Sequence, residues 1–345
     1  MFEAIKQAKS QSLIPTDETE NGVPYIVQSM FNNMFSRKVN KQWLIENNEA
    51  PVSGNRIVLG VTLPAVSYQP LEFGASQVIT AKSIWLNEKN GIFISIAISK
   101  LMNQFSYNQK PGLQIYKDLE IQLPTKNGKI DFEFIESYVS ELQTEQMKVL
   151  DAYLIATDLK NYILTAEEEK VLNDYKNQEF NEFNVIDIFE VKNTKNILSR
   201  DIIDNSGKTP YLCASTENNA ISSYISYDEK YLDKGNCVFI GGKTFVVTFQ
   251  EKDFYSNDSH NLALYSRNKE KNKLNQLYLA TCINKSLGYK YSWGDSISNR
   301  KIQTDKVSLP IVKKQPNYEI METFISAIQK LVIKDVVLYV NKKLE

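Results

Sequence analysis

The feature that most constrains this chain is a long helical pattern that occurs twice. Residues 131–163 contain no Pro or Gly, and residues 317–343 repeat their pattern 186 positions later. Apolar residues recur at alternating spacings of four and three, which is the heptad seam of helices that pair. The sequence therefore predicts two long paired helices with Leu142 and Ile328 buried. The predicted seam residues are Ile135, Val139, Leu142, Val149, Tyr153 and Ala156, then Met321, Ile325, Ile328, Val332 and Tyr339.

The sequence in front of each helix repeats as well. Pro24-Tyr25 and Pro210-Tyr211 are 186 residues apart, and so are Asn32-Asn33 and Asn218-Asn219. Such a register predicts two diverged copies of one unit, each with strands and helices and ending in a long helix. The predicted fold class is α+β, with two mixed α/β domains. The predicted parts are a first domain (1–130), a central helix and connector (131–180), a second domain (181–312) and a C-terminal helix (313–345).

Local patterns refine this organisation. Residues 91–104 predict a helix and residues 119–124 a short strand that Pro124 ends. In the connector, Thr165 followed by Glu168 is a capping-box pattern. The lead-in 181–188 of the second copy has no counterpart in front of Phe2. The first copy therefore lacks its first strand or loop, or takes it from the C-terminus or from a partner.

Composition excludes several classes of protein. The N-terminus lacks the apolar core of a signal peptide, and no apolar run is long enough for a membrane span. Cys213, Cys237 and Cys282 have no metal-binding spacing and predict reduced thiols in a cytoplasmic protein. Residues 131–180 hold twelve acidic and four basic residues, which leaves 36 basic and 29 acidic residues elsewhere. An acidic connector thus joins mildly basic domains.

No chemistry is visible in the motifs. The segment 241–244, Gly-Gly-Lys-Thr, resembles the end of a phosphate-binding loop, but a strand pattern follows it, so a basic hairpin tip is predicted. His260 is the only histidine and has no nucleophilic partner in sequence, and Glu168 and Lys170 form a nuclease-like triplet on a helical connector. We therefore predict no catalytic residue, no metal ligand and no cofactor.

The remaining candidates are polar, basic and aromatic loop residues. Arg, Lys, Asn and Gln can pair with base edges, while Lys and Ser can hold phosphates. A solvated surface explains the same residues individually, so the hypothesis concerns them as a set. The candidate DNA-binding residues are Arg37, Lys38, Arg56, Tyr68, Gln77, Lys82, Lys243, Lys252, Tyr255, Asn257, His260, Ser298, Asn299, Arg300 and Lys301.

The layout resembles the DNA-specificity (S) subunits of type I and type IIB restriction–modification systems. The resemblance covers nearly the whole chain and is strongest at Phe183, the Asp187–Phe189 step, residues 207–211 and Leu309-Pro310. It implies two target recognition domains that each read half of a split site in double-stranded DNA. It also implies long helices that lie antiparallel and set the spacing, since about 30 helical residues span about 45 Å.

The same resemblance implies a non-catalytic chain whose partners are methyltransferase subunits and, in some systems, a restriction subunit. S-adenosylmethionine would bind the methyltransferase. Two alternatives from other classes are a nuclease that acts alone and a two-domain scaffold that binds protein or carbohydrate. The recognised bases and the choice between type I and type IIB do not follow from the sequence.

Overall fold

The computed structural model describes residues 2–5, 11–105, 109–268 and 272–345, which form two compact units. Unit 1 comprises residues 1–150 and unit 2 residues 151–343, so the division falls within the first long helix. Both units mix short strands with helices, which confirms the predicted α+β class. In the described part of the chain, every helix is too short or too polar to cross a membrane.

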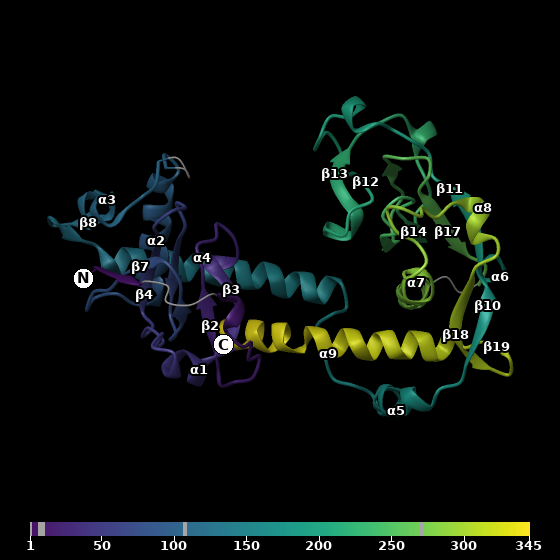
Figure 1. The fold of residues 1–345 in the computed structure, drawn as a ribbon, viewed down its shortest axis with the longest axis horizontal. Coiled ribbons are helices and arrows are strands. Elements are labelled where there is room, and N and C mark those ends of the chain that lie inside the picture. The colour runs from purple at the N-terminus through teal and green to yellow at the C-terminus, as the bar shows by residue number, and fades with distance from the viewer. Residues whose placement is uncertain (1, 6–10, 106–108, 269–271) are drawn as a thin grey trace. The chain divides into compact units, whose positions relative to one another are not determined.

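Unit 1 is built on two small sheets and a two-stranded sheet, β8-β9 (Figure 1). The antiparallel sheet has the order β1-β7-β4-β5, and the second has the order β3-β2-β6 with β2 and β6 parallel. Helix α2 packs on β5 and β4 and closes the larger core. The elements are β1 (Phe2–Ile5), η1 (Gln11–Leu13), β2 (Gly22–Ile26), η2 (Asn32–Met34), β3 (Phe35–Asn40), α1 (Lys41–Glu46), β4 (Arg56–Gly60), β5 (Val66–Gln69), β6 (Gly74–Ala75), β7 (Val78–Ala81), α2 (Glu88–Met102), α3 (Leu113–Asp118), β8 (Thr125–Lys126), β9 (Lys129–Ile130) and α4 (Phe132–Ala156).

Unit 2 repeats this topology. Its antiparallel sheet has the order β11-β17-β14-β15, and its second sheet has the order β13-β12-β16 with β12 and β16 parallel. Its third sheet has the order β10-β18-β19, where unit 1 has the two-stranded sheet β8-β9. The elements are α5 (Ala166–Asp174), η3 (Tyr175–Asn177), β10 (Phe180–Asn184), α6 (Val185–Ile188), β11 (Phe189–Asn193), η4 (Ser199–Asp201), β12 (Thr209–Leu212), η5 (Asn218–Ala220), β13 (Ile221–Ile225), η6 (Glu229–Tyr231), β14 (Cys237–Ile240), β15 (Val247–Gln250), β16 (Tyr255–Ser256), β17 (Leu262–Ser266), α7 (Lys273–Leu287), α8 (Asn299–Ile302), β18 (Lys306–Val312), β19 (Gln315–Pro316) and α9 (Tyr318–Leu344).

The two units also share the hydrogen bonds that join their two sheets. Asn33, at φ 51°, donates to the carbonyl of Tyr68 at 3.2 Å and accepts from Gln69 at 2.9 Å. Asn219, at φ 53°, makes the same two bonds with the end of β15, at 2.9 and 2.8 Å. Asparagine adopts this left-handed backbone more readily than most residues. The repeated frame confirms the predicted duplication.

Several local predictions can be compared with the structure. The helix predicted over 91–104 is α2, and the capping box of Thr165 and Glu168 starts α5 as predicted. The strand predicted over 119–124 is wrong, because these residues are not in a sheet. In unit 2 the matching strand β18 pairs with β10, whereas the described part of unit 1 places no strand beside 119–124.

The heptad seam is only partly buried. Ile135 and Val139 lie in the core, but Leu142 is 42% exposed and Ile328 is half-buried, so the predicted burial of Leu142 is wrong. The antiparallel pairing of α4 and α9 stays a prediction. The other exposed seam residues are Val149, Tyr153, Ala156, Val332 and Tyr339.

Candidate nucleic-acid interface

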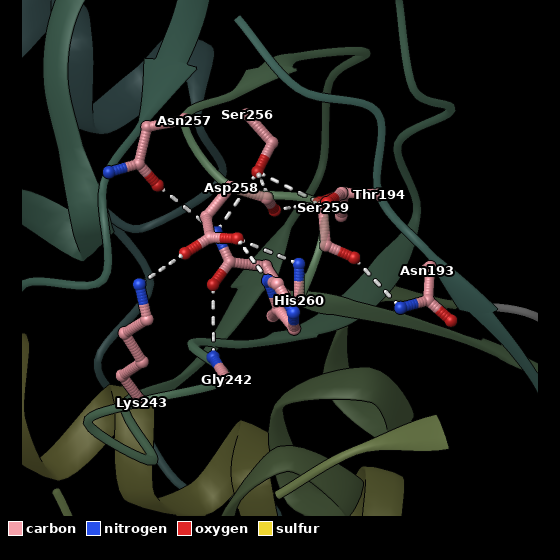
Figure 2. Close-up of polar contacts among 10 residues, drawn as sticks. Asn193, Thr194, Gly242, Lys243, Ser256, Asn257, Asp258, Ser259 and His260 are labelled. Carbon is pink, nitrogen blue, oxygen red and sulfur yellow. Dashed lines mark hydrogen bonds and ion pairs between the residues drawn. The ribbon is translucent and has the colours of Figure 1, made fainter. Parts of the chain in front are cut away.

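Three loops of unit 2 meet at one corner of its larger sheet. They are the turn 241–246 between β14 and β15, the loop 257–261 between β16 and β17, and the segment 290–296 after α7. They line a hollow of about 300 Å³, whose walls include Lys243, Asn257 and Trp293. Figure 2 shows the polar side chains from the first two loops around Asp258.

The Asp258 carboxylate organises this corner. Its Oδ2 lies 3.0 Å from Lys243 Nζ, while its Oδ1 accepts from the His260 backbone N–H at 2.9 Å and lies 2.8 Å from His260 Nδ1 (Figure 2). Burial raises the pKa of Asp258, but the bonds from His260 and Lys243 outweigh it and lower the pKa to about 2. The carboxylate is therefore ionised at neutral pH and fixes one cationic and one imidazole side chain beside each other.

The glycines of the turn allow the two loops to touch. The Gly242 N–H donates to Asn261 Oδ1 at 2.9 Å. A Cβ at Gly242 would lie 2.3 Å from the His260 carbonyl oxygen, so a larger residue would push the loops apart. The turn leads into strand β15 and not into a helix. The predicted hairpin tip is thus confirmed, and a phosphate-binding loop of the helix-starting kind is excluded here.

A polar chain links the short helix α8 to the same corner. Ser298 accepts from the Lys301 N–H as the N-cap of α8. Asn299 Nδ2 donates to Asn193 Oδ1 at 3.0 Å, and Asn193 Nδ2 donates to the Ser259 carbonyl at 2.8 Å (Figure 2 shows the second bond). Lys301 is paired with Asp295. Of the predicted residues 298–301, Asn299 is therefore linked to the loop 257–261.

Two predicted residues of unit 2 do not belong to this corner. Tyr255 is buried, and its hydroxyl donates to the Tyr227 carbonyl at 2.8 Å, so the predicted DNA contact is wrong. Lys252 is exposed but follows β15, while the turn 241–246 precedes it. The whole length of the β14–β15 hairpin separates Lys252 from the turn.

Two of the DNA contacts predicted in unit 1 are also wrong. Arg56 is buried at the start of β4, where Nη1 donates to Thr80 Oγ1 at 3.0 Å. Tyr68 lies beneath α2, since a Cβ at Gly91 would be 2.4 Å from its ring. Both side chains are core components because β4 and β5 are covered on the faces from which these residues project. Neither can reach DNA without opening the domain.

The other predicted residues of unit 1 are dispersed. Arg37 Nη2 donates to the carbonyls of Gln11 and Ile14 and is half-buried, and Lys38 is half-buried beside the Thr19 carbonyl. Lys82 is exposed just after β7. Gln77 is exposed at φ 52° between β6 and β7, where unit 2 has Asp258 between β16 and β17. Their contact with DNA stays a prediction.

The matching corner of unit 1 has different chemistry. Its turn 61–65 is held by Gln28, whose Oε1 accepts from the N–H groups of Thr62 and Leu63 at 2.6 and 3.2 Å. Thr62 stands 181 positions before Lys243, the offset that also relates Gln77 to Asp258. A turn held by an amide in unit 1 thus corresponds to a turn with a charged side chain in unit 2.

Sequence reasoning misses the residues that organise both corners. The sequence shows the residue types of Asp258 and Asn193 but not their partners. Trp293 is 75% exposed at the edge of the hollow, and a tryptophan between polar loop residues is a signal that could have found this corner. Gln28 is distant in sequence from the turn that it holds.

The described residues contain no cluster of three or more His, Cys, Asp or Glu side chains that could hold a metal ion. His260 is mostly exposed and contacts a carboxylate, not a nucleophile. The corner is suited to hydrogen bonding and to charge pairing, which are the interactions by which proteins hold phosphates and read base edges.

Comparison with known proteins shows what the chain is similar to. A family model of the type I restriction modification DNA specificity domain matches residues 177–338. The type II restriction enzyme specificity subunit S.BcgI of Heyndrickxia coagulans is 23% identical over 321 residues, which cover 91% of this chain and 88% of that protein.

The fold agrees over a longer stretch. The type I restriction–modification S subunit from M. genitalium superposes with a TM-score of 0.55 at 16% identity and covers 99% of this chain and 89% of that one. This likeness extends the agreement to the first copy, which lies outside the family-model match. By these likenesses, the chain is similar to the DNA specificity subunits of restriction–modification systems, and residues 177–338 match the type I DNA specificity domain.

Proposed function

We propose that this chain is the non-catalytic DNA-reading subunit of a restriction–modification complex, in which each unit reads one half of a bipartite site. The observation that carries the proposal is that the two units share a strand order but differ in the residues at the matching loops. Thr62 and Gln77 in unit 1 correspond to Lys243 and Asp258 in unit 2. Two domains that share a backbone fold but differ in the polar side chains of their loops can recognise two different half-sites.

The corner of unit 2 supports specific roles. Lys243 is half-exposed and held by Asp258, so its ammonium is positioned for a phosphate. Asn257 and Asn299 offer amide groups, which can pair with an adenine edge. Arg300 is exposed next to Asn299 and can pair with a guanine edge.

The partner of the chain is proposed to be a methyltransferase subunit that binds S-adenosylmethionine. The support is the apolar surface left on the long helices: Val332 is 73% exposed, and Val149 and Tyr153 are more than half exposed. Apolar side chains in a helical stripe are typical of a surface that another protein covers. A restriction subunit, where present, would join the same complex.

The experiment that tests this function maps methylated bases. The chain is co-expressed with a methyltransferase subunit from the same system, and methylation is profiled over a randomised bipartite site. Asn299→Ala and Arg300→Ala are each expected to cost about 1–3 kcal/mol and to relax one half of the site only. Gln77→Ala is expected to alter the other half. A change of preference in both halves from one substitution would contradict the division of labour.

Experiments with the same purified chain and the same DNA test the two alternative functions, a nuclease that acts alone and a scaffold for protein or carbohydrate. A reader of DNA binds duplex with an affinity that falls steeply with salt, whereas a scaffold for protein or carbohydrate does not. A nuclease that acts alone would cut the randomised site without any partner. Binding that is insensitive to salt, or cutting by the purified chain, would therefore replace the proposal.

A further inference from the structure

Unit 1 has an open apolar groove between α2 and α4. Its volume is about 1150 Å³. Phe93 of α2 and Tyr138 of α4 pack edge to face in its wall, with ring centroids 6.3 Å apart at 83°. Tyr138 and Leu142 are each more than 40% exposed there. The described residues of unit 1 leave this surface uncovered.

Unit 2 has the same groove, but there it is filled. Tyr278 of α7 and Phe324 of α9 stand at 6.3 Å and 85°, as their counterparts do in unit 1. Tyr175, which follows α5, stacks on Phe324 with centroids 3.9 Å apart and shares a hydrogen bond with the Tyr278 hydroxyl. Residues 165–177 are thus the cover of this groove in the second copy.

The cover continues into a strand. In unit 2, β10 pairs antiparallel with β18, and Figure 1 shows them side by side as a teal and a yellow strand. Val307 and Leu309 of β18 are fully buried, while their counterparts Ile121 and Leu123 are partly exposed and not in a sheet. The described residues of unit 1 therefore provide neither a cover for the groove nor a strand beside residues 119–124.

The polar residues around the groove indicate which charges a bound segment would need. In unit 2, Glu168 accepts from Ser326 at 2.6 Å and pairs with Lys330 at 2.8 Å, but Thr144 stands where Lys330 does. Lys306 pairs with Glu182 of β10 at 3.2 Å, but Glu120 stands where Lys306 does. A segment that binds unit 1 therefore needs a neutral residue at the position of Glu168, which would face Thr144. It needs a basic residue at the position of Glu182, which would face Glu120.

We propose that this face of unit 1 binds a segment of a different polypeptide, built as a short helix, an aromatic residue and then a basic strand that pairs with residues 119–124. A second copy of this chain is a poor source, because its residues 165–184 are engaged in its own unit 2. Adding a strand to an unpaired segment is a common mode of peptide binding. Since Phe93 replaces Tyr278, the aromatic residue needs no hydroxyl.

The test uses the full chain and two synthetic peptides. The probe peptide spans residues 163–186 of this chain with the substitutions Glu168→Gln and Glu182→Lys, and the control peptide has the unchanged sequence. Calorimetric titration is expected to show one probe peptide bound per chain. The control peptide is expected to bind about tenfold more weakly or worse, because its buried carboxylate meets no cation.

Variants of the chain locate the site. Tyr138→Asp, or Leu142→Asp if the first variant folds poorly, is expected to weaken probe binding about tenfold or more, because the charge enters an apolar contact. Phe31→Asp, at an exposed aromatic residue of unit 1 outside the groove lining, is expected to leave it unchanged. Failure of the probe to bind, or binding that both groove variants retain, would overturn the proposal. Sedimentation is the last check, since a dimer that Tyr138→Asp dissociates would assign the face to a second copy instead.

Discussion

At the scale of single residues, the informative group is a carboxylate. Asp258 holds Lys243 and His260 at one corner of unit 2, and its low pKa keeps it charged at neutral pH. A fixed lysine loses less side-chain entropy on meeting a phosphate than a mobile one does. Asp258 thus favours anion binding by ordering Lys243, although its own negative charge repels an anion.

This arrangement leads to a matched pair of substitutions. Lys243→Ala is expected to weaken binding to every duplex and to lower the slope of log affinity against log salt by about one, because one phosphate contact is lost. Lys252→Ala removes the same charge at the far end of the hairpin and is expected to leave the slope unchanged. Equal slopes for both variants, measured by anisotropy over a salt series, would remove Lys243 from the interface.

Sequence reasoning places the candidates 257, 260 and 298–301 in loops or at the start of a short helix, and the structure links Asn299 through Asn193 to the loop 257–261. Their contact with DNA stays a prediction. The predictions for Arg56, Tyr68 and Tyr255 are wrong because the residue type alone does not tell whether a side chain is buried or exposed. The covering helix above Tyr68 depends on Gly91, which only the folded chain brings next to it.

At the scale of elements, the connector helix α5 is bound to α9 through one buried acid. Burial raises the pKa of Glu168, but bonds from Lys330, Ser326 and Thr165 outweigh it and lower the pKa to about 2. A carboxyl with a lowered pKa stabilises the fold above its ordinary value of 4.5, and the contribution is lost as pH falls toward about 2.

Glu168→Gln is therefore expected to cost about 2–3 kcal/mol at pH 7, since Lys330 keeps its burial but loses its charge partner. The difference from the unsubstituted chain is expected to shrink steadily below pH 4.5. Urea unfolding at pH 7 and at about pH 3 measures this. Glu169→Gln, at the exposed neighbouring position, is the control, and an equal cost for both would contradict the role of the buried pair.

The long helix α4 gives a second element-scale prediction. Val139→Asp is expected to cost about 3 kcal/mol or more, because it puts an unpaired charge into the core. Leu142→Asp is expected to cost less than about 1 kcal/mol, since Leu142 is half-exposed. Thermal melting of the two variants decides this, and a severe loss from Leu142→Asp would restore the buried seam that the heptad pattern predicts.

At the scale of the whole molecule, the duplication could be predicted from the sequence, because one offset of 186 residues recurs at several separate motifs. The identical strand orders of the two units confirm it. The open groove and the unpaired residues 119–124 could not be predicted, since residues 119–124 have the same apolar pattern as β18. Only the neighbouring strand distinguishes them.

Under the proposed function, the purified chain is expected neither to methylate nor to cleave DNA, because it would supply only the recognition of DNA to the complex. The assay measures methyl transfer from labelled S-adenosylmethionine to duplex DNA, with and without a methyltransferase subunit. Activity that appears only with both proteins is the expected result. Methylation by the chain alone would assign it chemistry of its own.

The hydrogen bonds of Asn33 and Asn219 have a consequence for how such a protein changes over generations. These bonds fix the frame of each unit at places remote from the corner turns 61–65 and 241–246. Substitutions at exposed turn positions such as Lys243 therefore leave most of the folding free energy untouched. Selection for a new DNA sequence and selection for folding act on different residues, so the chain can vary its target while its fold stays constant.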